Sequence, residues 1–557
     1  MRNIVIVNAT STGKNYVYDI IRRNYRPYIL EPSLSSKANI NLIQERQALR
    51  KQFESVAEYL EEKESYAETL EMIRALNPVL VIPGGEHGVR LAARLADDLR
   101  LPGNSYANID KYTNKNAMHE ALKARGIRSI RGKVVHSEEE AIAFYREEKL
   151  RGCVVKPEYG AASSGVHLCD NEVDMLAAIR ENMAEVNVFG DKVNILIQER
   201  IVGTEYIVNT VSCEGKHRLS SIWRYQKKKV EGGGNVYEYA ELITHLEVGH
   251  RRLIQYAYNV ADAVEYRYGA IHGEFIVDEK GPVLIEINCR VMGAGMTAEY
   301  LDDVLGHHET DNVLDSYLNP RWHDQMLDAP YRPYKKAYMY FFITPEDMKV
   351  AMSPALPLIT HLRSYFAGSI GSVASGCLDR TVDLETMSGM LYLKHENELV
   401  VRNDVEFLQR TEQQYFDMLF LKDKAVPPRI PEKLESVGDM IQICQCNRSI
   451  LVLTNDETLD VNASIVRVGQ GNTVVGKYNW GILDWNYRED EDIESIVADF
   501  YALASKIQKG GHILIPERTY WHLPCGMESV EILAASAGYT LEAPGINSGK
   551  AVKITVE

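Results

Sequence analysis

The sequence lacks a long apolar run, and its cysteines are few and scattered. No 18-residue apolar stretch occurs, so no membrane-spanning helix is expected. The eight cysteines form no CxxC pair, and Cys444 and Cys446 are the only close pair. This favours reduced thiols over a disulfide framework or a cysteine-based metal site. The apolar run in MRNIVIVNAT is too short for a signal-peptide core. We therefore expect a soluble cytoplasmic protein.

An excess of positive charge is also missing. The formal net charge is −16, whereas proteins that bind the nucleic-acid backbone usually present a basic surface. No nucleic-acid partner is therefore expected. Hydrophobic residues make up 45% of the 557 residues and charged residues 25%, which is typical of globular proteins. This length predicts roughly three to four domains.

The order of strand and helix patterns predicts an α/β and α+β fold in four parts. The first part, residues 1–105, alternates strands and helices like a small Rossmann-like α/β domain, with PVLVIPGG as a buried strand and turn. Mixed patterns follow in residues 106–320, and a β-rich region follows in residues 321–435. Residues 436–557 predict a last α/β domain.

One glycine-containing turn near the start could be mistaken for a nucleotide loop. NATSTGKN, Asn8 to Asn15, follows a strand and opens a helix, and it contains Gly13 and Lys14. A P-loop needs glycine at the first place and Ser or Thr at the last, and both places hold Asn here. The hydroxyl group for Mg²⁺ is missing, so we do not expect a P-loop.

A better phosphate-binding pattern lies in VVKPEYGAASSGVHL, Val154 to Leu168. A short β-branched run delivers Lys156, and a loop of small residues follows, including Gly160, Ser163, Ser164 and Gly165. Small residues let the backbone approach a ligand, and successive N–H groups form an anion-binding concavity. The alternative is an ordinary Gly/Ser turn between strands.

The most informative stretch is AIHGEFIVDEKGPVLIEINCRVMGAG, which predicts a β-hairpin. A three-residue loop at residues 279–281 would place Glu274 opposite Glu286 and His272 opposite Asn288. Two facing carboxylates destabilise a sheet unless something compensates them. Mg²⁺ would do so, because it prefers carboxylate, amide and phosphate oxygens. The alternative is a solvated polar face.

Two further features accompany this hairpin. Arg290 would share the face of Glu286 and Asn288, and its planar fork suits a phosphate or an acyl phosphate. IQERIVGTEYIVN adds Glu199 and Glu205 around a turn, where acids could meet the amino group of adenine and the ribose hydroxyls. The alternative for these two acids is a plain β-turn with exposed glutamates.

Taken in order, these segments resemble the ATP-grasp family over roughly residues 110–295. The resemblance implies two ATP-binding lysines, Lys115 in NKNAMHEAL and Lys156 in VVKP, with residues 160–166 as the flexible phosphate lid. It also implies that Glu199 and the backbone near Val202 read adenine, and that Glu205 binds ribose.

The same resemblance implies the cofactors and the reaction. Glu274, Glu286 and Asn288 would hold Mg²⁺, as two ions, with Mn²⁺ as an alternative metal. A carboxylate–amine ligase would use ATP to form an acyl phosphate, which an amine then attacks. Lys156 and Arg290 would stabilise the transferred phosphate.

Within this family the sequence is similar to the L-amino-acid ligases, which implies amino acids as small-molecule partners and leaves a homodimer open. SSIWRYQKKKVEGGGNVYEYAELI resembles their substrate loop, with Arg224 as a ligand for a carboxylate or a phosphate. Backbone N–H groups near Gly293 and Gly295 would stabilise an oxyanion. His272 is either a polar wall of the site or a hydrogen-bonded sheet residue. The lysines at 227–229 read as a solvated turn.

Residues 436–557 resemble the later half of a class I methyltransferase fold. The glycine-rich cofactor loop is absent, and ILVLTNDETLDV stands in its place. We therefore expect a degenerate, non-catalytic domain. Two other functions compete with the amino-acid ligase: a carboxylase-like or purine-pathway ATP-grasp ligase, and a non-catalytic nucleotide-binding scaffold.

Overall fold

The computed structural model describes residues 1–33, 40–158, 165–184, 194–230, 235–346, 348–349, 359, 362–370, 377–378, 380–384, 386–419, 450–454, 464–467, 478–484, 500–516, 534, 540–542 and 551–555. The chain divides into two compact units, Met1–Tyr338 with Asp383–Glu385, and Met339–Val382 with Thr386–Glu557. The finer boundaries predicted at residues 105, 320 and 435 stay predictions. Among the described helices, none is long and apolar enough to cross a membrane.

The first unit begins with a parallel sheet of order β3-β2-β1-β4. Its strands are β1 (Arg2–Val7), β2 (Tyr25–Glu31), β3 (Glu58–Glu61) and β4 (Pro78–Pro83). Alternate residues of a strand face opposite sides. Ile4 and Ile6 of β1 therefore pack with α1 (Tyr16–Arg22) and α2 (Ile40–Phe53). Val5 and Val7 pack with α3 (Tyr66–Ala75) and α4 (Val89–Asp98). The predicted α/β fold class of this part is confirmed.

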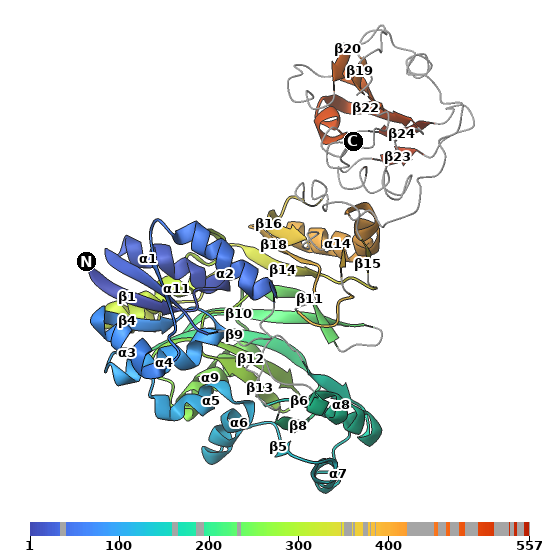
Figure 1. Cartoon of the computed structure of the whole chain (residues 1–557). Coiled ribbons are helices and arrows are strands. Elements are labelled where there is room, and N and C mark those ends of the chain that lie inside the picture. The colour runs from blue at the N-terminus through green and yellow to red at the C-terminus, as the bar shows by residue number, and fades with distance from the viewer. Residues whose placement is uncertain are drawn as a thin grey trace. The chain divides into compact units, whose positions relative to one another are not determined.

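A small antiparallel sheet of order β5-β8-β6-β7 follows along the chain. Its strands are β5 (Gly132–Val135), β6 (Cys153–Pro157), β7 (His167–Cys169) and β8 (Ile195–Glu199). The helices α7 (Glu138–Glu147) and α8 (Glu172–Ala184) pack on it through one apolar cluster that includes Phe144, Val155 and Ile179. Figure 1 shows this subdomain as a distinct group of elements within the first unit.

The central antiparallel sheet of the first unit has the order β13-β12-β9-β10-β11, continued by the start of β14 (Lys336–Phe342). Its strands are β9 (Thr204–Cys213), β10 (Lys216–Lys229), β11 (Asn235–Leu242), β12 (Gly269–Asp278) and β13 (Gly281–Asn288). The helices α9 (Val248–Ala263), α5 (Ile109–Thr113) and α6 (Lys115–Ala124) pack against it around Val208, Ile222 and Phe275.

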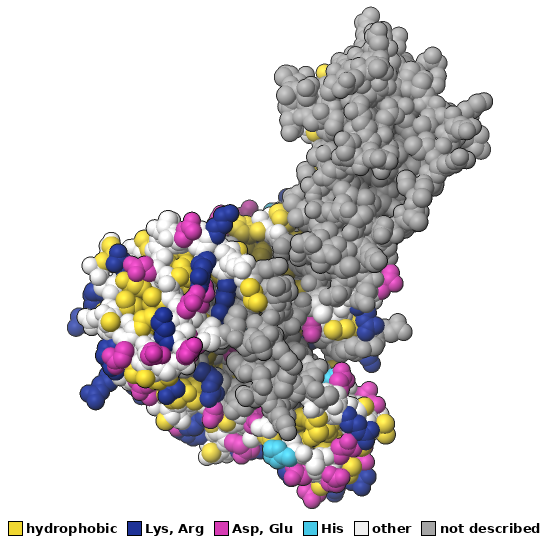
Figure 2. Space-filling model, in the orientation of Figure 1, with side chains coloured by type: hydrophobic (Ala, Val, Ile, Leu, Met, Phe, Trp, Pro, Cys, Tyr) yellow, Lys and Arg dark blue, Asp and Glu magenta, His cyan; other side chains and the backbone are white. Residues whose placement is uncertain are grey.

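Three helices complete the first unit, namely α10 (Ala298–Leu305), α11 (Glu309–Leu318) and α12 (Pro320–Met326). Val313 and Leu314 of α11 belong to the same apolar cluster as α1 and β1. They therefore fasten the N-terminal domain to the central sheet. On the face seen in Figure 2, acidic and basic side chains are interspersed over this unit.

The second unit contains the end of β14, β16 (Tyr365–Ile370), β18 (Gly389–His395) and α14 (Glu398–Leu419), with a short pair of β15 (Met348–Lys349) and β17 (Cys377–Leu378).

A separate sheet of order β20-β19-β21-β22-β24-β23 follows in the second unit. Its strands are β19 (Ile450–Thr454), β20 (Ser464–Arg467), β21 (Tyr478–Asp484), β22 (Ile507–Pro516), β23 (Thr540–Glu542) and β24 (Ala551–Thr555). The first four strands run parallel, and β24 pairs antiparallel with β22 and β23. The predicted methyltransferase likeness of this part stays a prediction.

Candidate nucleotide and metal site

The two acids predicted to face each other do so. Glu274 of β12 pairs with Glu286 of β13, and His272 pairs with Asn288. The predicted three-residue loop is wrong, because Asp278 pairs with Gly281 and only two residues lie between them. A β-bulge at Ile285 restores the expected pairing, since Phe275 pairs with Leu284 while Glu274 pairs with Glu286.

Two lysines from other elements reach this pair of acids. The Nζ of Lys115, at the start of α6, lies 3.1 Å from Glu286 Oε2. Lys156 comes from β6, and burial lowers its pKa to about 8 although Glu286 and Glu274 oppose that shift. The backbone N–H of Lys115 donates to the carbonyl of Glu158 at 3.3 Å, which ties α6 to the end of β6. Tertiary structure thus brings both predicted ATP-binding lysines to the hairpin.

A second ion pair lies on the same face. The Nζ of Lys227 lies 2.8 Å from Glu205 Oε1, and it also lies 4.3 Å from the ring centroid of Tyr237. Burial raises the pKa of Glu205, although Lys227 opposes the shift. Reading Lys227 as part of a solvated turn was wrong, because it belongs to β10. Lys227 follows Tyr225 by two residues, so both side chains point to the same face if the segment is a strand. This spacing was the signal that could have identified Lys227.

His272 is a buried, hydrogen-bonded member of the sheet beside the acids. Its Nδ1 donates to Asn209 Oδ1 at 2.8 Å, and its Nε2 lies 3.4 Å from Glu274 Oε1. Burial lowers the pKa of His272, and the Glu274 carboxylate opposes this. His272 therefore fits both alternatives left open by the sequence. It is a hydrogen-bonded residue of the sheet, and it also borders Glu274, one of the candidate metal ligands.

Arg290 follows the hairpin and pairs with an acid from the N-terminal domain. Its Nε donates to Glu86 Oε2 at 3.1 Å, and its Nη1 donates to the Val291 carbonyl at 3.1 Å. Glu86 was not identified from the sequence. It follows the glycine turn after β4, at the carboxyl end of a parallel strand, where ligands of α/β sheets commonly bind.

The segment Asn8–Asn15, which partly resembles a P-loop, forms hydrogen bonds with the loop that follows Arg290. Thr12 Oγ1 donates to the Gly293 carbonyl at 2.8 Å and accepts the Met296 N–H at 3.1 Å. A Cβ on Gly13 would lie 1.9 Å from the Gly84 carbonyl oxygen, so close packing explains this glycine without a phosphate.

A hydrogen bond between Gly295 and Ser11 corrects one predicted role. The backbone N–H of Gly295 donates to Ser11 Oγ at 2.9 Å, so we do not retain it as an oxyanion donor. The carbonyl of Gly293 is occupied by Thr12, as described above, and its N–H group stays a candidate donor.

The predicted adenine residues lie at the end of β8, and the carboxylate of Glu199 is already engaged. Glu199 accepts hydrogen bonds from the Arg131 backbone N–H at 3.0 Å and from Arg131 Nη2 at 2.6 Å, and this arginine lowers its pKa against the effect of burial. Val202 is exposed. The structure therefore leaves the backbone near Val202, rather than the Glu199 side chain, as the candidate contact for adenine.

Arg224 does not join the other predicted residues. In the strand pairing, Trp223 lies opposite Ile207, which lies opposite Glu274, so Trp223 shares the face of the acids. Arg224 therefore projects from the other face. There it pairs with Glu241, which Lys336 Nζ also approaches at 2.7 Å. Its predicted role as a substrate ligand is not supported.

Part of the predicted phosphate loop falls outside the described residues, namely Gly160, Ser163 and Ser164. Gly165 is described, with a φ of +68° that favours glycine. Its carbonyl accepts a hydrogen bond from Asn182 Nδ2 at 3.1 Å, which attaches the end of the loop to α8.

The residues of the hairpin fit a magnesium ion by their chemistry. Glu274, Glu286 and Asn288 supply oxygen donors only, and Mg²⁺ prefers such ligands. In this structure Lys115 pairs with Glu286, and Glu274 lies beside His272, at the distances given above. We therefore keep these three residues as the candidate metal ligands.

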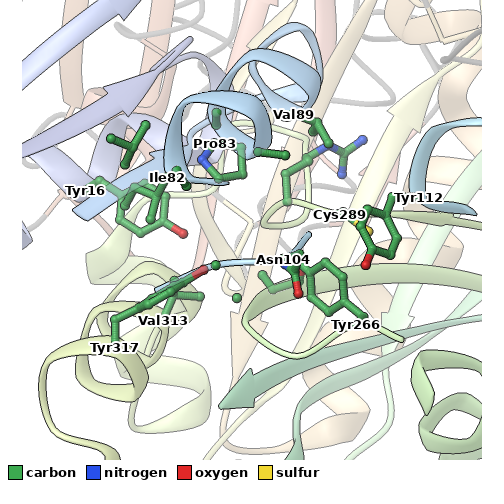
Figure 3. A pocket seen from close by; sticks show the side chains of 18 residues that line it. Tyr16, Ile82, Pro83, Val89, Asn104, Tyr112, Tyr266, Cys289, Val313 and Tyr317 are labelled. Carbon is green, nitrogen blue, oxygen red and sulfur yellow. The ribbon is translucent and has the colours of Figure 1, made fainter. Parts of the chain in front are cut away.

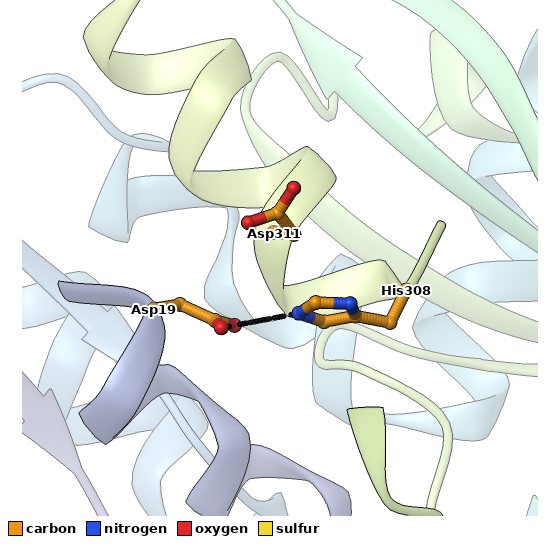
Figure 4. Close-up of side chains that lie close together, drawn as sticks. All are labelled: Asp19, His308 and Asp311. Carbon is orange, nitrogen blue, oxygen red and sulfur yellow. Dashed lines mark hydrogen bonds and ion pairs between the residues drawn. The ribbon is translucent and has the colours of Figure 1, made fainter. Parts of the chain in front are cut away.

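Another cluster of potential metal ligands is an internal hydrogen-bond network. Ligand atoms of Asp19, His308 and Asp311 lie within 4.8 Å of one another (Figure 4). Asp19 Oδ2 accepts from Thr310 Oγ1 at 2.6 Å and lies 3.0 Å from His308 Nε2, and Asp19, His308 and Thr310 are all buried. We assign it to the contact of α1 with α11.

A small cavity behind Arg290 is too small for a nucleotide. It has a volume of about 40 Å³ and is lined by residues of the N-terminal domain and the central sheet, including Tyr16, Tyr112, Cys289 and Tyr317 (Figure 3). This is room for a few water molecules. The cavity therefore does not compete with the hairpin as the candidate site.

Comparison with known proteins identifies the domain that contains the hairpin. Residues 151–299 match the family model for the ATP-grasp domain. Dapdiamide A synthase from Enterobacter agglomerans is 25% identical over 348 residues, which cover 61% of this chain and 80% of that protein.

Two solved structures share the fold. L-amino acid ligase from Bacillus licheniformis has a TM-score of 0.57 at 16% identity, over 76% of this chain and 99% of that one. Carboxyaminoimidazole ribonucleotide synthase from Aspergillus clavatus, solved with ATP, has a TM-score of 0.53 at 15% identity, over 74% and 99%. Residues 151–299 therefore match the ATP-grasp domain, as the sequence predicted, and the chain shares its fold with these two structures.

Proposed function

We propose that this protein is an ATP-dependent carboxylate–amine ligase that joins an amino acid, or a similar carboxylate, to an amine or a second amino acid. The observation that carries the proposal is the meeting of Glu274 and Glu286 with Lys115 and Lys156, which come from three separate parts of the chain. Paired acids and buried lysines at one place suit a metal-bound triphosphate better than a plain structural role.

In the proposed reaction, a substrate carboxylate oxygen attacks the γ-phosphorus of ATP, and the bond to the β-phosphate oxygen breaks to release ADP. The amine then attacks the acyl carbon, loses a proton and expels phosphate. Lys115 and Lys156 would bind the phosphate oxygens, and Arg290 would orient the transferred group. Mg²⁺ bound by Glu274, Glu286 and Asn288 would neutralise phosphate charge.

Relatives support the amine-ligase reading. The names of two of them, dapdiamide A synthase and L-amino acid ligase, denote enzymes that join small molecules. The carboxyaminoimidazole ribonucleotide synthase keeps a purine-pathway ligase as a second candidate. A non-catalytic nucleotide-binding scaffold is disfavoured. It would not need the two candidate metal-binding acids and the two candidate phosphate-binding lysines, and the chain has all four.

A product search tests the proposal. The full chain would be incubated with ATP, MgCl₂ and a mixed pool of amino acids, and new products would be identified by mass spectrometry alongside ADP release. We expect an amide product that requires ATP. ADP release with bicarbonate or formate alone would favour the second candidate, and tight ATP binding without ADP release in any mixture would favour a scaffold.

A further inference from the structure

A large cavity of the first unit lies apart from the candidate nucleotide and metal site. Its volume is about 1030 Å³, and residues of β10, α9, α11 and α12 line it, together with the segment after α12. Its described lining includes none of the predicted ATP or metal residues. This volume is sufficient for a small organic ligand.

One arginine in the cavity wall has no acidic partner. Among the described residues, no carboxylate forms an ion pair with Arg218. Its Nη1 donates to Asn312 Oδ1 at 3.4 Å, and its guanidinium lies 5.4 Å from the ring centroid of Trp322. Burial lowers the pKa of Arg218, and Tyr258 opposes this shift only in part, as expected for a partly desolvated charge.

A histidine beside this arginine is fixed as a neutral hydrogen-bond donor. Asn312 Nδ2 donates to His307 Nδ1 at 2.8 Å, and Asn312 Oδ1 accepts from Arg218, so the amide orientation is consistent. Because His307 Nδ1 accepts, the proton of the neutral ring is on Nε2. Burial and the neighbouring Arg218 lower the pKa of His307 to about 4, so the ring is neutral near pH 7.

The acids that line the cavity are paired with other cations. Asp302 Oδ1 lies 2.7 Å from His308 Nδ1, and Asp315 Oδ1 lies 2.6 Å from Arg23 Nη2. Asp311, labelled in Figure 4, lies 2.8 Å from Arg23 Nη1. Among the described acids of the cavity wall, these contacts leave none to balance the positive charge of Arg218.

The remaining wall is rich in aromatic and apolar side chains. Tyr258, Trp322, Tyr331 and Tyr334 line the cavity together with Leu219 and Ile254. Tyr331 is held in place because its hydroxyl donates to the Ile243 carbonyl at 3.0 Å. Such a wall suits the apolar body of a ligand whose anionic end reaches Arg218.

We propose that this cavity is a second ligand site, which binds a small organic carboxylate with an aromatic or aliphatic body. The carboxylate is bound by Arg218 and by the Nε2–H of His307, and Asn312 orients both donors. A neutral donor beside a planar guanidinium matches a carboxylate, which accepts several hydrogen bonds at once. The proposal does not depend on the ligase function.

Isothermal titration calorimetry on the full chain tests this site with 3-phenylpropionate, which has no amino group. We expect it to bind the wild-type protein and the Arg290→Gln variant alike, and to bind Arg218→Gln at least about tenfold more weakly. The neutral 3-phenylpropionamide should also bind the wild-type protein at least about tenfold more weakly than the acid.

Binding that is unchanged in Arg218→Gln, or lost in Arg290→Gln alone, would overturn the proposal, because the acid would then occupy the candidate active site. Tighter binding of inorganic phosphate than of 3-phenylpropionate would overturn the ligand class.

Circular dichroism checks the fold of each variant. If Arg218→Gln does not fold, His307→Phe replaces it, because this change removes the Nε2–H and keeps a neutral ring. Unchanged affinity in that variant would count against the proposal.

Discussion

Lys115 forms an ion pair with Glu286, although 170 residues of chain separate them; their Nζ and Oε2 atoms lie 3.1 Å apart. Glu286 in turn lies opposite Glu274 on the neighbouring strand. The lysine therefore occupies one side of the acid pair, and this arrangement gives the first test of the metal assignment.

Replacing Glu286 should abolish turnover without unfolding the protein. Glu286→Ala removes a candidate metal ligand. It relieves the repulsion between two facing carboxylates but also removes the partner of Lys115, and these two effects oppose each other, so the protein should stay folded. ADP release and thermal unfolding with and without MgCl₂ and ATP measure the two effects. Glu279→Ala is the matched control, because Glu279 is an exposed glutamate in the turn of the same hairpin. Retained ADP release in Glu286→Ala would contradict the metal assignment.

Removing the charge of Lys156 should stabilise the protein without nucleotide and metal. Its pKa is about 8 in the folded chain and 10.5 in the unfolded chain, so the unfolded state binds more protons between these values. The charged lysine therefore opposes folding at pH 7, and this effect disappears as the pH rises from about 8 to 10.5. Lys156→Met should gain on the order of 3 kcal/mol at pH 7.

Urea unfolding of the wild type and of Lys156→Met, at several pH values, measures this difference. The gain should shrink toward zero near pH 10.5, while other groups cancel in the comparison. A gain that stays constant across this pH range would show that the charge of Lys156 is not its cause.

Breaking the pair of Lys227 and Glu205 should destabilise the fold, because it leaves a buried acid without its cation. Lys227→Met should cost about 1–3 kcal/mol of unfolding free energy, and the double variant with Glu205→Gln should recover part of this loss. A double-mutant cycle in urea measures the coupling. Lys229→Met is the matched control, because Lys229 lies two residues further along the same strand and is exposed. Additive effects of the two changes would mean that the pair contributes nothing.

Thr12→Val should impair catalysis more than ATP binding. This change removes both hydrogen bonds that Thr12 makes with residues 293 and 296, next to Arg290. We expect kcat to fall about tenfold while the affinity for ATP changes little. Lys14→Ala is the control, because a P-loop would require this lysine for ATP binding. A loss of ATP binding in Lys14→Ala would restore the P-loop interpretation.

The pairing of the hairpin shows how much of the candidate site the periodicity of the strands could predict. Acids at residues 274 and 286 were predicted to face each other, and they do. The route was partly wrong, because the turn is one residue shorter than predicted and the bulge at Ile285 compensates for it. A bulge depends on packing between strands, so one sequence does not reveal it.

Arg224 and Lys227 illustrate the same limit on β10. Both were visible as basic residues in one segment, and the sequence favoured Arg224 for the site. The strand pairing puts Arg224 on one face of the sheet and Glu274 on the other. Lys227 instead pairs with Glu205, on the same face as Glu274. Which face of a strand becomes a site depends on the neighbouring strands, which lie far away in the sequence.

The sequence by itself determined the order of the elements and the chemistry of the hairpin, because alternation along a strand and the types of its side chains are local properties. Only the tertiary structure decided that Glu86 would reach Arg290, that Thr12 would hold the loop after it, and that Arg218 would pair with none of the described acids. These are contacts between segments far apart in the chain, and they form only when the packing of helices and sheets brings those segments together.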